Sequence, residues 1–135
     1  MATKVLDSHA LLTFFQDEAG AEEVEKLLAR AEAGTHRLLL CVVNWGEVYY
    51  STMRKISRGA AEEKAREIAS LPIELVPVGA DLELVRQAAA YKASGKLAYA
   101  DAFAAALAKL SNAELVTGDA DFKAIEDEIR IRWLR

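Results

Sequence analysis

Short apolar runs alternate along the chain with longer stretches in which apolar residues recur at helical spacing. The continuous run Leu38–Val43 is typical of a strand that is buried on both faces. Directly after it, apolar positions recur at i, i+3, i+4, i+7 and i+11, which predicts a helix with one buried face formed by Trp45, Val48, Tyr49, Thr52 and Ile56. The same reasoning over the whole chain predicts strands at 4–6, 38–43, 73–76, 115–117 and, as an edge strand, 129–133, and helices at 8–15, 21–33, 44–56, 60–70, 80–92, 99–110 and 120–126.

Strands that alternate with helices in this way predict an α/β fold. We expect three layers, α/β/α, with a mainly parallel central sheet of about four to five strands, formed by one domain over residues 1–135. In such sheets the functional crevice lies beyond the carboxyl ends of the strands. Polar residues that directly follow a predicted strand are therefore the candidates for function.

Composition limits the classes of protein to be considered. Hydrophobic residues make up 53% of the chain, and no apolar run approaches the roughly 20 residues needed to span a bilayer, so we expect a globular cytoplasmic protein without a membrane segment. The single cysteine, Cys41, excludes an internal disulfide, and the two histidines, His9 and His36, lack the spacing of zinc ligands. A net charge of −4 disfavours broad nonspecific binding to nucleic acid, so any grip on RNA must be local.

Four carboxylates occupy the positions that the predicted fold marks as functional. Asp7 closes the first strand, Glu47 lies in the first turn of the helix after the second strand, and Asp119 follows the fourth strand, with Asp121 just beyond. Each has an ordinary structural interpretation, because Asp is a preferred N-cap and an acid in the first turn of a helix is favoured by the helix dipole. Asp101, the fourth, opens the most apolar helix of the chain.

Asp101 is harder to explain structurally. It is the only acid between Leu97 and Leu110, and no cation precedes Lys109 in its helix. Both sides of that helix are expected to be buried, one through Phe103, Leu107 and Leu110 and the other, on the side of Asp101, through Ala104, Ala105 and Ala108. A carboxylate in such surroundings is costly unless it is paired or binds a metal ion.

Together the four carboxylates predict a metal site. Clustered carboxylates repel one another unless a cation lies between them, and a site of oxygen ligands alone favours Mg²⁺ or Mn²⁺. Such a site can activate water and hold a phosphodiester for in-line displacement. Arg54 and Arg58 extend a stripe from Glu47 and Ser51 that could contact flanking phosphates, with a solvated helix face as the alternative. Lys92 and Lys96, in the approach to Asp101, form a weaker second patch.

These residues resemble the motifs of the PIN-domain family, in particular its VapC-type toxins. The resemblance runs in the family's order through Val5-Leu6-Asp7-Ser8, Glu47, Leu97–Ala102 and Leu115–Phe122, and so covers nearly the whole chain. It implies a Mg²⁺-dependent endoribonuclease acting on single-stranded or structured RNA, a homodimer, and inhibition by a VapB-like antitoxin whose tail blocks the acidic cleft. It implies that the catalytic residues around the metal are Asp7, Glu47, Asp101 and Asp119. Of these, Asp7, Asp101 and Asp119 would bind the metal, with Asp121 as an alternative ligand. It also implies supporting roles for Ser8, Asn44 and Thr117.

Other functions fit the same residues less well. A phosphatase with an N-terminal Asp nucleophile usually needs an acid two residues later, where this chain has His9, and a phosphoacceptor domain needs an Asp where Pro77-Val78-Gly79 follows the third strand. Neither function explains Asp101. A housekeeping RNA-processing nuclease and a PIN-like binding module without catalysis remain as alternatives within the family.

Overall fold

A five-stranded parallel sheet forms the centre of the molecule in the computed structural model, which describes residues 1–95 and 97–135. Its strand order is β3-β2-β1-β4-β5, and every neighbouring pair is parallel. The strands are β1 (Ala2–Leu6), β2 (His36–Cys41), β3 (Glu74–Val76), β4 (Glu114–Thr117) and β5 (Ile131–Trp133). The predicted α/β fold class is confirmed, and so is the final edge strand, although it is shorter than expected.

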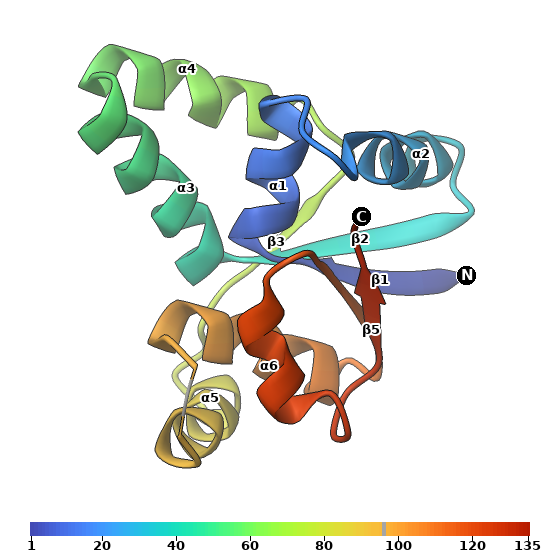
Figure 1. Cartoon of the computed structure of the whole chain (residues 1–135), viewed down its shortest axis with the longest axis vertical. Helices are drawn as coiled ribbons and strands as arrows, with labels where there is room; N and C mark the ends of the chain where they lie inside the picture. Colours follow the sequence, from blue (N-terminus) through green and yellow to red (C-terminus); the bar gives the residue numbers. More distant parts are fainter. Residues whose placement is uncertain (96) are drawn as a thin grey trace.

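Helices cover both faces of this sheet, as Figure 1 shows. One face packs against the helices α1 (Ser8–Phe15), α2 (Ala21–Glu32), α3 (Val42–Lys55) and α4 (Arg58–Ala69). The other face packs against α5 (Glu83–Ala93), α6 (Tyr99–Leu110) and the short 3₁₀ helix η1 (Ala120–Ile125). Within the described residues, no helix is long and apolar enough to cross a membrane.

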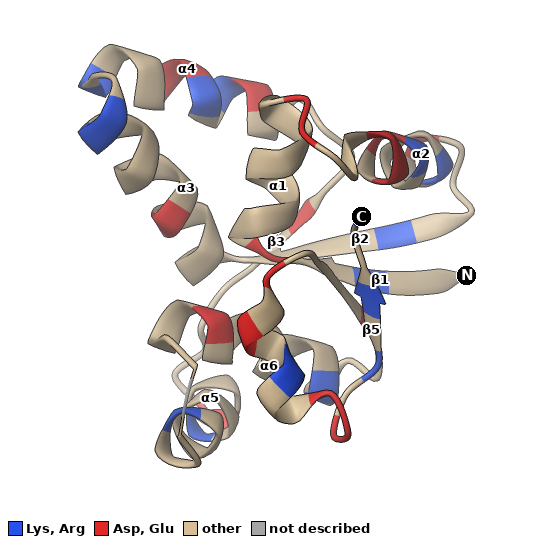
Figure 2. Cartoon of the chain, in the orientation of Figure 1, with Lys and Arg blue, Asp and Glu red and all other residues tan. Residues whose placement is uncertain are grey.

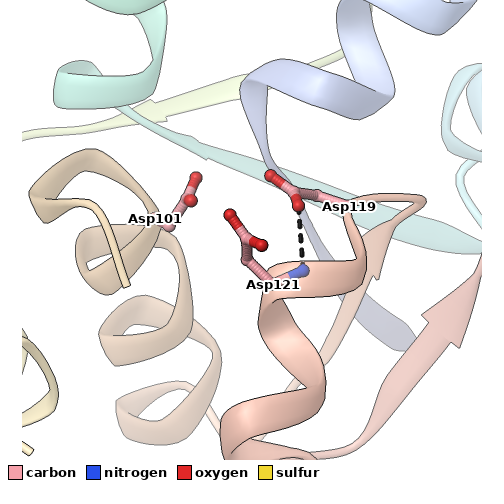
Figure 3. Close-up of side chains that lie close together, drawn as sticks. All are labelled: Asp101, Asp119 and Asp121. Atoms are coloured by element: carbon pink, nitrogen blue, oxygen red, sulfur yellow. Dashed lines mark hydrogen bonds between the residues drawn. The ribbon is translucent and has the colours of Figure 1, made fainter. Parts of the chain in front are cut away.

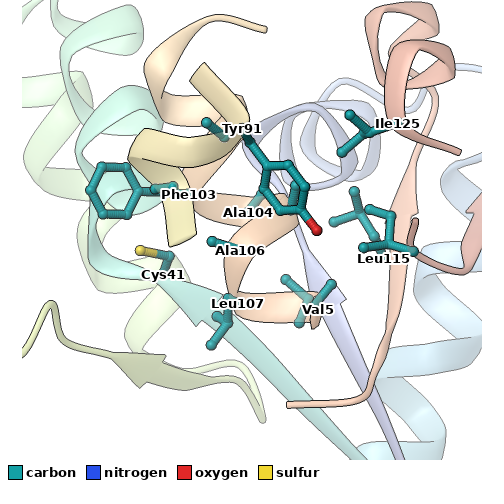
Figure 4. Close-up of a cluster of buried hydrophobic side chains, with 14 of the residues drawn as sticks. Val5, Cys41, Tyr91, Phe103, Ala104, Ala106, Leu107, Leu115 and Ile125 are labelled. Atoms are coloured by element: carbon teal, nitrogen blue, oxygen red, sulfur yellow. The ribbon is translucent and has the colours of Figure 1, made fainter. Parts of the chain in front are cut away.

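Two separate cores lie on the two faces of the sheet because successive strand residues point in opposite directions. Val5 and Leu39 join the core with α5 and α6, whereas Leu6 and Leu40 join the core with α1 to α4. Figure 4 shows the first core, in which the alanine-rich helix α6 packs closely on the strands. The expected burial of the second strand on both faces is therefore confirmed, and Cys41 is buried within it.

The strand order places a topological switch point between β1 and β4. From β1 the chain moves first to β2 and β3 on one side and later to β4 and β5 on the other. Ligands of parallel α/β sheets bind at such a switch point, beyond the carboxyl ends of the strands. Asp7 follows β1 and Asp119 follows β4 at this end.

The junction of β2 and α3 differs from the prediction. The strand ends at Cys41, whose backbone is extended, and the helix begins at Val42, two residues before the expected start at Asn44. The apolar run did not mark this boundary because Val42 and Val43 continue it into the helix. Glu47 consequently lies in the second turn of α3, not in the first.

The end of α3 also differs. Ser57 caps a new helix by accepting a hydrogen bond from the amide of Ala60 at 3.0 Å, so Gly59 lies inside α4 and does not precede it. Arg58 is therefore the first residue of α4, and the predicted single stripe on α3 stops at Arg54. Ile56 was wrongly assigned to the buried face, because its side chain is 73% exposed.

Helices α5 and α6 differ from the prediction in where α5 begins and in which residues are buried. Helix α5 begins at Glu83, not at Ala80, because the chain turns at Leu82 with a positive φ of 68°. Its buried residues are Leu84, Ala88 and Tyr91, and Val85 packs partly buried against the same core, whereas Leu82 and Ala89, which were expected to face inward, are exposed. Leu110, expected to be buried at the end of α6, is exposed.

The end of α2 matches the prediction. Gly34 follows the helix with φ +84°, a conformation that favours glycine. Its amide donates to the carbonyl of Ala31, and the amide of Thr35 donates to the carbonyl of Arg30, both at 3.0 Å. This paired arrangement ends α2 and starts the turn into β2.

Candidate metal centre

Three carboxylates from two elements converge at the carboxyl end of the sheet. Asp101 projects from the first turn of α6, Asp119 caps η1 and Asp121 lies in its first turn. Each offers one oxygen atom, and these atoms all lie within 4.8 Å of one another. Figure 3 shows the three side chains directed toward a common point between the two helices. Asp119, the expected metal ligand, and Asp121, the alternative ligand, thus both belong to the cluster.

Asp7 lies beside this cluster but its oxygens are already hydrogen-bonded. Its Oδ1 accepts from the amide of Ala10 at 2.8 Å, which makes it the N-cap of α1. Its Oδ2 accepts from the Thr117 hydroxyl at 2.6 Å, and that hydroxyl accepts from the amide of Asp119 at 3.0 Å. Thr117 therefore connects the carboxylate of Asp7 to the backbone amide of Asp119, and the capping function of Asp7 does not preclude a second role.

Glu47 is held by a different contact. The Ser8 hydroxyl donates to Glu47 Oε1 at 2.5 Å, which joins the start of α1 to the middle of α3. Glu47 is not one of the three converging carboxylates, but its charge raises the pKa of Asp101. It comes from α3, whereas the three converging carboxylates come from α6 and the start of η1.

Asn44 connects the two helices that carry Glu47 and Asp101. Its side chain is fully buried, and its Nδ2 donates to the carbonyl of Ala100 at 3.0 Å. Its Oδ1 has no hydrogen-bond partner among the described residues. Since Ala100 directly precedes Asp101, this bond fixes the first turn of α6 relative to α3.

The environment of the cluster favours protonated carboxyls. Burial raises the pKa of Asp101 to about 7, and the carboxylates of Asp119, Glu47 and Asp121 raise it as well. Burial also raises the pKa of Asp7 to about 7, against the hydrogen bonds from Thr117 and Ala10, which lower it. Two acids with pKa values this far above the ordinary 3.8 lie within one site.

These carboxylates form no ion pair with a cation among the described residues. Within residues 1–95 and 97–135, none of the salt bridges involves Asp7, Glu47 or the three converging carboxylates. A set of carboxylate oxygens without imidazole or thiolate ligands suits a hard divalent cation. The residues therefore fit the metal ion that the sequence predicts, and a cation bound among them would also remove their mutual repulsion.

A match to a known protein family identifies the family of this chain. A PIN-domain model matches residues 4–128. The chain belongs to the PIN-domain family. No curated protein sequence matches the chain.

Solved structures resemble this PIN domain over nearly its full length. The VapBC2 complex of Rickettsia felis, bound to a DNA fragment from its promoter, matches with a TM-score of 0.73 and 14% identity over 98% of this chain and 99% of the other. VapC20 of Mycobacterium tuberculosis, a toxin that cleaves the sarcin–ricin loop, matches with a TM-score of 0.67 and 20% identity over 90% and 93%. A toxin–antitoxin complex of Klebsiella pneumoniae matches with a TM-score of 0.64 and 22% identity over 90% and 92%. At these identities the likeness shows the shared fold.

The predicted basic residues lie away from the acidic centre of the PIN domain. Figure 2 shows a group of Lys and Arg at the corner where α3 meets α4, with acidic segments further along α4 and others near the middle of the molecule. Arg54 is exposed and lies over the ring of Tyr50, 5.5 Å from its centroid. Arg58 is exposed at the start of α4. Lys92 donates to the carbonyl of Leu97 at 3.0 Å and so holds the segment that precedes α6. Lys96 lies outside the described residues.

One residue near the centre escaped the sequence analysis. His9 was considered only as a zinc ligand, yet its Nδ1 accepts a hydrogen bond from the amide of Gly118, 109 residues away. Its position two residues after Asp7 is the only sequence signal that could have suggested a role. No spacing pattern indicates a contact between the start of α1 and a turn so distant in the chain.

Proposed function

We propose that this PIN domain, over residues 1–135, is a divalent-metal-dependent endoribonuclease. The observation that carries the proposal is the convergence of three unpaired carboxylates at the switch point of the sheet, with Asp7 and Glu47 beside them. Asp101 and Asp119 would hold the ion, Mg²⁺ in preference and Mn²⁺ as an alternative, together with Asp7 or Asp121. When bound, the ion would activate a water molecule and neutralise the charge of the phosphodiester.

The chain's own residues prepare this chemistry. Thr117 orients Asp7 and the backbone of Asp119 through one hydroxyl group. Ser8 orients Glu47, whose carboxylate can accept a proton from a water molecule in line with the scissile phosphate. Asn44 fixes the first turn of α6 and with it Asp101. Arg54, Arg58, Lys92 and Lys96 would contact phosphates that flank the cleaved bond.

Cleavage of end-labelled single-stranded RNA tests the enzymatic proposal. We expect cleavage with Mg²⁺ or Mn²⁺ and none with excess EDTA, because an all-oxygen site requires a hard cation. Glu114→Gln serves as the control variant, since it removes a carboxylate at the opposite end of the sheet and should leave cleavage unchanged. Undiminished cleavage in EDTA, or an essential bound zinc, would contradict the proposal.

We further propose that the enzyme is the toxin of a VapBC-type pair. Its structural neighbours include toxin–antitoxin complexes, and the sequence motifs resemble those of VapC-type toxins. The protein would then form a homodimer, and the tail of a VapB-like antitoxin would block the acidic centre. We expect induced expression to arrest growth, and co-expression of a small neighbouring reading frame to restore it. Growth without arrest, despite cleavage of RNA in vitro, would favour a housekeeping nuclease, and binding of RNA without cleavage would favour a silent module.

A further inference from the structure

His9 links the first helix to the turn that carries Asp119. It lies in the first turn of α1, two residues after Asp7, and its ring is exposed. Its Nδ1 accepts from the backbone amide of Gly118 at 3.2 Å. Gly118 lies between Thr117 and Asp119, so the contact falls on the backbone that aims one of the converging carboxylates.

The ring of His9 occupies the space that a Cβ atom at position 118 would need. A Cβ atom there would lie 2.6 Å from Cε1 of His9 and 3.2 Å from its Nδ1, which is too close. Gly118 does not have the positive φ found at Gly20, Gly34 and Gly95, so its backbone conformation does not require glycine. The imidazole and the glycine therefore fit each other at this point.

Donor and acceptor roles fix the state of the ring. Because the Gly118 amide can only donate, the Nδ1 that accepts from it carries no proton, and the proton of the neutral ring lies on Nε2. The buried Thr13 hydroxyl lies 3.4 Å from the same Nδ1, one helical turn further along α1. With Nδ1 unprotonated, the Thr13 hydroxyl can act here only as a donor, and it shares the single lone pair of Nδ1 with the Gly118 amide.

The turn is thus held at each of its three residues. Thr117 is bonded to Asp7, Gly118 to His9, and the amide of Asp119 to the Thr117 hydroxyl. The first and third contacts involve the predicted metal-site residues themselves, whereas the second comes from a residue outside the cluster. Without it, the Gly118 amide would lose its hydrogen bond to α1.

We propose that His9 is a positioning residue of the metal centre. Its Nδ1 holds the Gly118 amide and thereby fixes the carboxylate of Asp119 for the divalent ion. This role rests on the proposed metal-dependent function.

Three substitutions at position 9 test the acceptor atom itself. In Asn the side-chain oxygen takes nearly the place of Nδ1, whereas in Gln it lies one bond further along the side chain. We expect Mn²⁺ and Mg²⁺ affinity, measured by isothermal titration calorimetry, to fall about 10-fold in His9→Ala and His9→Gln. His9→Asn should restore affinity to within about threefold of the native protein. Saturating Mg²⁺ should recover most of the RNA-cleavage rate in all three variants.

A double-mutant cycle with Gly118→Ala tests the contact from its other side. Alone, Gly118→Ala should displace the His9 ring and weaken ion binding about as much as His9→Ala. Combined with His9→Ala, it should add little, because the clash is already gone. Melting temperatures of the metal-free variants, expected to stay close to the native value since His9 is exposed, separate a local effect from unfolding.

The outcomes distinguish this role from the metal site as a whole. A native protein that binds neither ion would overturn the metal site and the role of His9 with it. If the native protein binds the ions but His9→Ala and His9→Gln bind them equally tightly, the role of His9 alone would be overturned. Equal losses in Ala, Gln and Asn variants, or additive losses in the double mutant, would also contradict positioning through Nδ1.

Discussion

At the amino end of the sheet, the carboxylates that begin strands are paired with cations. Glu114 opens β4 and lies 2.8 Å from the Lys4 ammonium group, its direct neighbour on β1. Glu74 opens β3 and contacts the Arg37 guanidinium of β2 at 2.7 Å, which lowers the pKa of Glu74. The fold therefore supplies its own counter-charges at this end.

At the carboxyl end of the sheet the carboxylates have no such partners within residues 1–95 and 97–135. Asp7 follows β1 and Asp119 follows β4, and Asp101 lies near both. Burial and mutual repulsion raise the pKa of Asp7 and of Asp101 to about 7, in the opposite direction to Glu74. Paired acids contribute modestly to stability, whereas unpaired buried acids cost stability until an external cation binds. The difference indicates which end of the sheet carries the chemistry.

Cavity volume points to the other end of the sheet. A cavity of about 510 Å³ lies between the end of α6 and the segment before β5, lined by charged residues that include Lys109, Glu126 and Arg130. This cavity contains none of the converging carboxylates. The electrostatic state of the carboxyls therefore separates the two ends better than the shape of the surface does.

Asp101→Asn should produce the largest effect and most directly tests the contrast between the two ends. RNA cleavage should fall by more than the roughly 10–100-fold typical of a residue that only supports a ligand. The metal-free variant should be at least as stable as the native protein near pH 8, because a repelling buried charge is gone. Melting curves with and without Mg²⁺ should show that the variant no longer gains stability from the ion.

The opposite result would have a clear meaning. If Asp101 were half of a structural ion pair, its replacement would leave a buried cation without a partner and cost several kcal/mol, about 3–5 on the scale of such pairs. A variant that melts far below the native protein, or one that keeps near-native cleavage, would show that Asp101 does not hold a metal ion.

The pH dependence of stability should be the next largest effect. Asp7 and Asp101 have pKa values of about 7 in the folded protein against 3.8 ordinarily, so the folded state keeps protons that the unfolded chain has released. Their stabilising contribution is present below about pH 4 and is lost as the pH rises through about 7. Urea unfolding of the metal-free protein from pH 5 to 8 should therefore show falling stability.

Mg²⁺ and Asp101→Asn provide the checks on this prediction. The stability gained from saturating Mg²⁺ should grow with pH, because the ion competes with protons for the same oxygens. In Asp101→Asn the fall between pH 5 and 8 should be shallower than in the native protein. A native protein whose metal-free stability rises over this range would contradict the raised pKa values.

The general form of the site could be predicted from the sequence because it follows from topology. Parallel strands place the residues after them on one edge, so Asp7 and Asp119 were correctly expected to lie near each other. The apolar composition around Asp101 was enough to identify it as buried. These inferences need only the periodicity of side chains and the high cost of burying a charge.

Local boundaries and distant contacts could not be predicted. The helix after β2 begins early because Val42 and Val43 suit either state, and Ser57 starts α4 by a capping bond that the apolar pattern does not reveal. These local events moved Arg58 onto another helix. The contact of His9 with Gly118 depends on the packing of α1 beside the turn after β4, which no local pattern specifies.

The exposed arginines should produce an intermediate effect, limited to RNA binding. Changing both Arg54 and Arg58 to Ala should weaken RNA affinity and lower the salt slope by about 0.7 for each lost phosphate contact on single-stranded RNA. Cleavage of saturating RNA should fall much less. The matched control is Arg37→Ala with Arg130→Ala, which removes the same charge at the amino end, where Arg37 contacts Glu74 and Arg130 contacts the carbonyl of Asn112. Equal losses in both double variants would assign the effect to net charge.

Glu114→Gln should produce the smallest effect, with a sign opposite to that of Asp101→Asn. The Glu114 carboxylate is paired with Lys4, and the two side chains are only 28% and 16% exposed, so its neutralisation leaves a half-buried ammonium group without its partner. We expect the free energy of unfolding to fall by about 0.2–1 kcal/mol, a decrease in Tm of roughly 1–4 °C for a chain of this size. Thermal melts of Glu114→Gln and Asp101→Asn in EDTA near pH 8 compare the loss of one negative charge at each end of the sheet.

Because the Lys4–Glu114 pair lies at the other end of the sheet from the proposed metal ligands, Mg²⁺ should stabilise Glu114→Gln as much as it stabilises the native protein. Destabilisation of the same sign and size in both variants would mean that the two ends of the sheet do not differ in how their carboxylates are balanced.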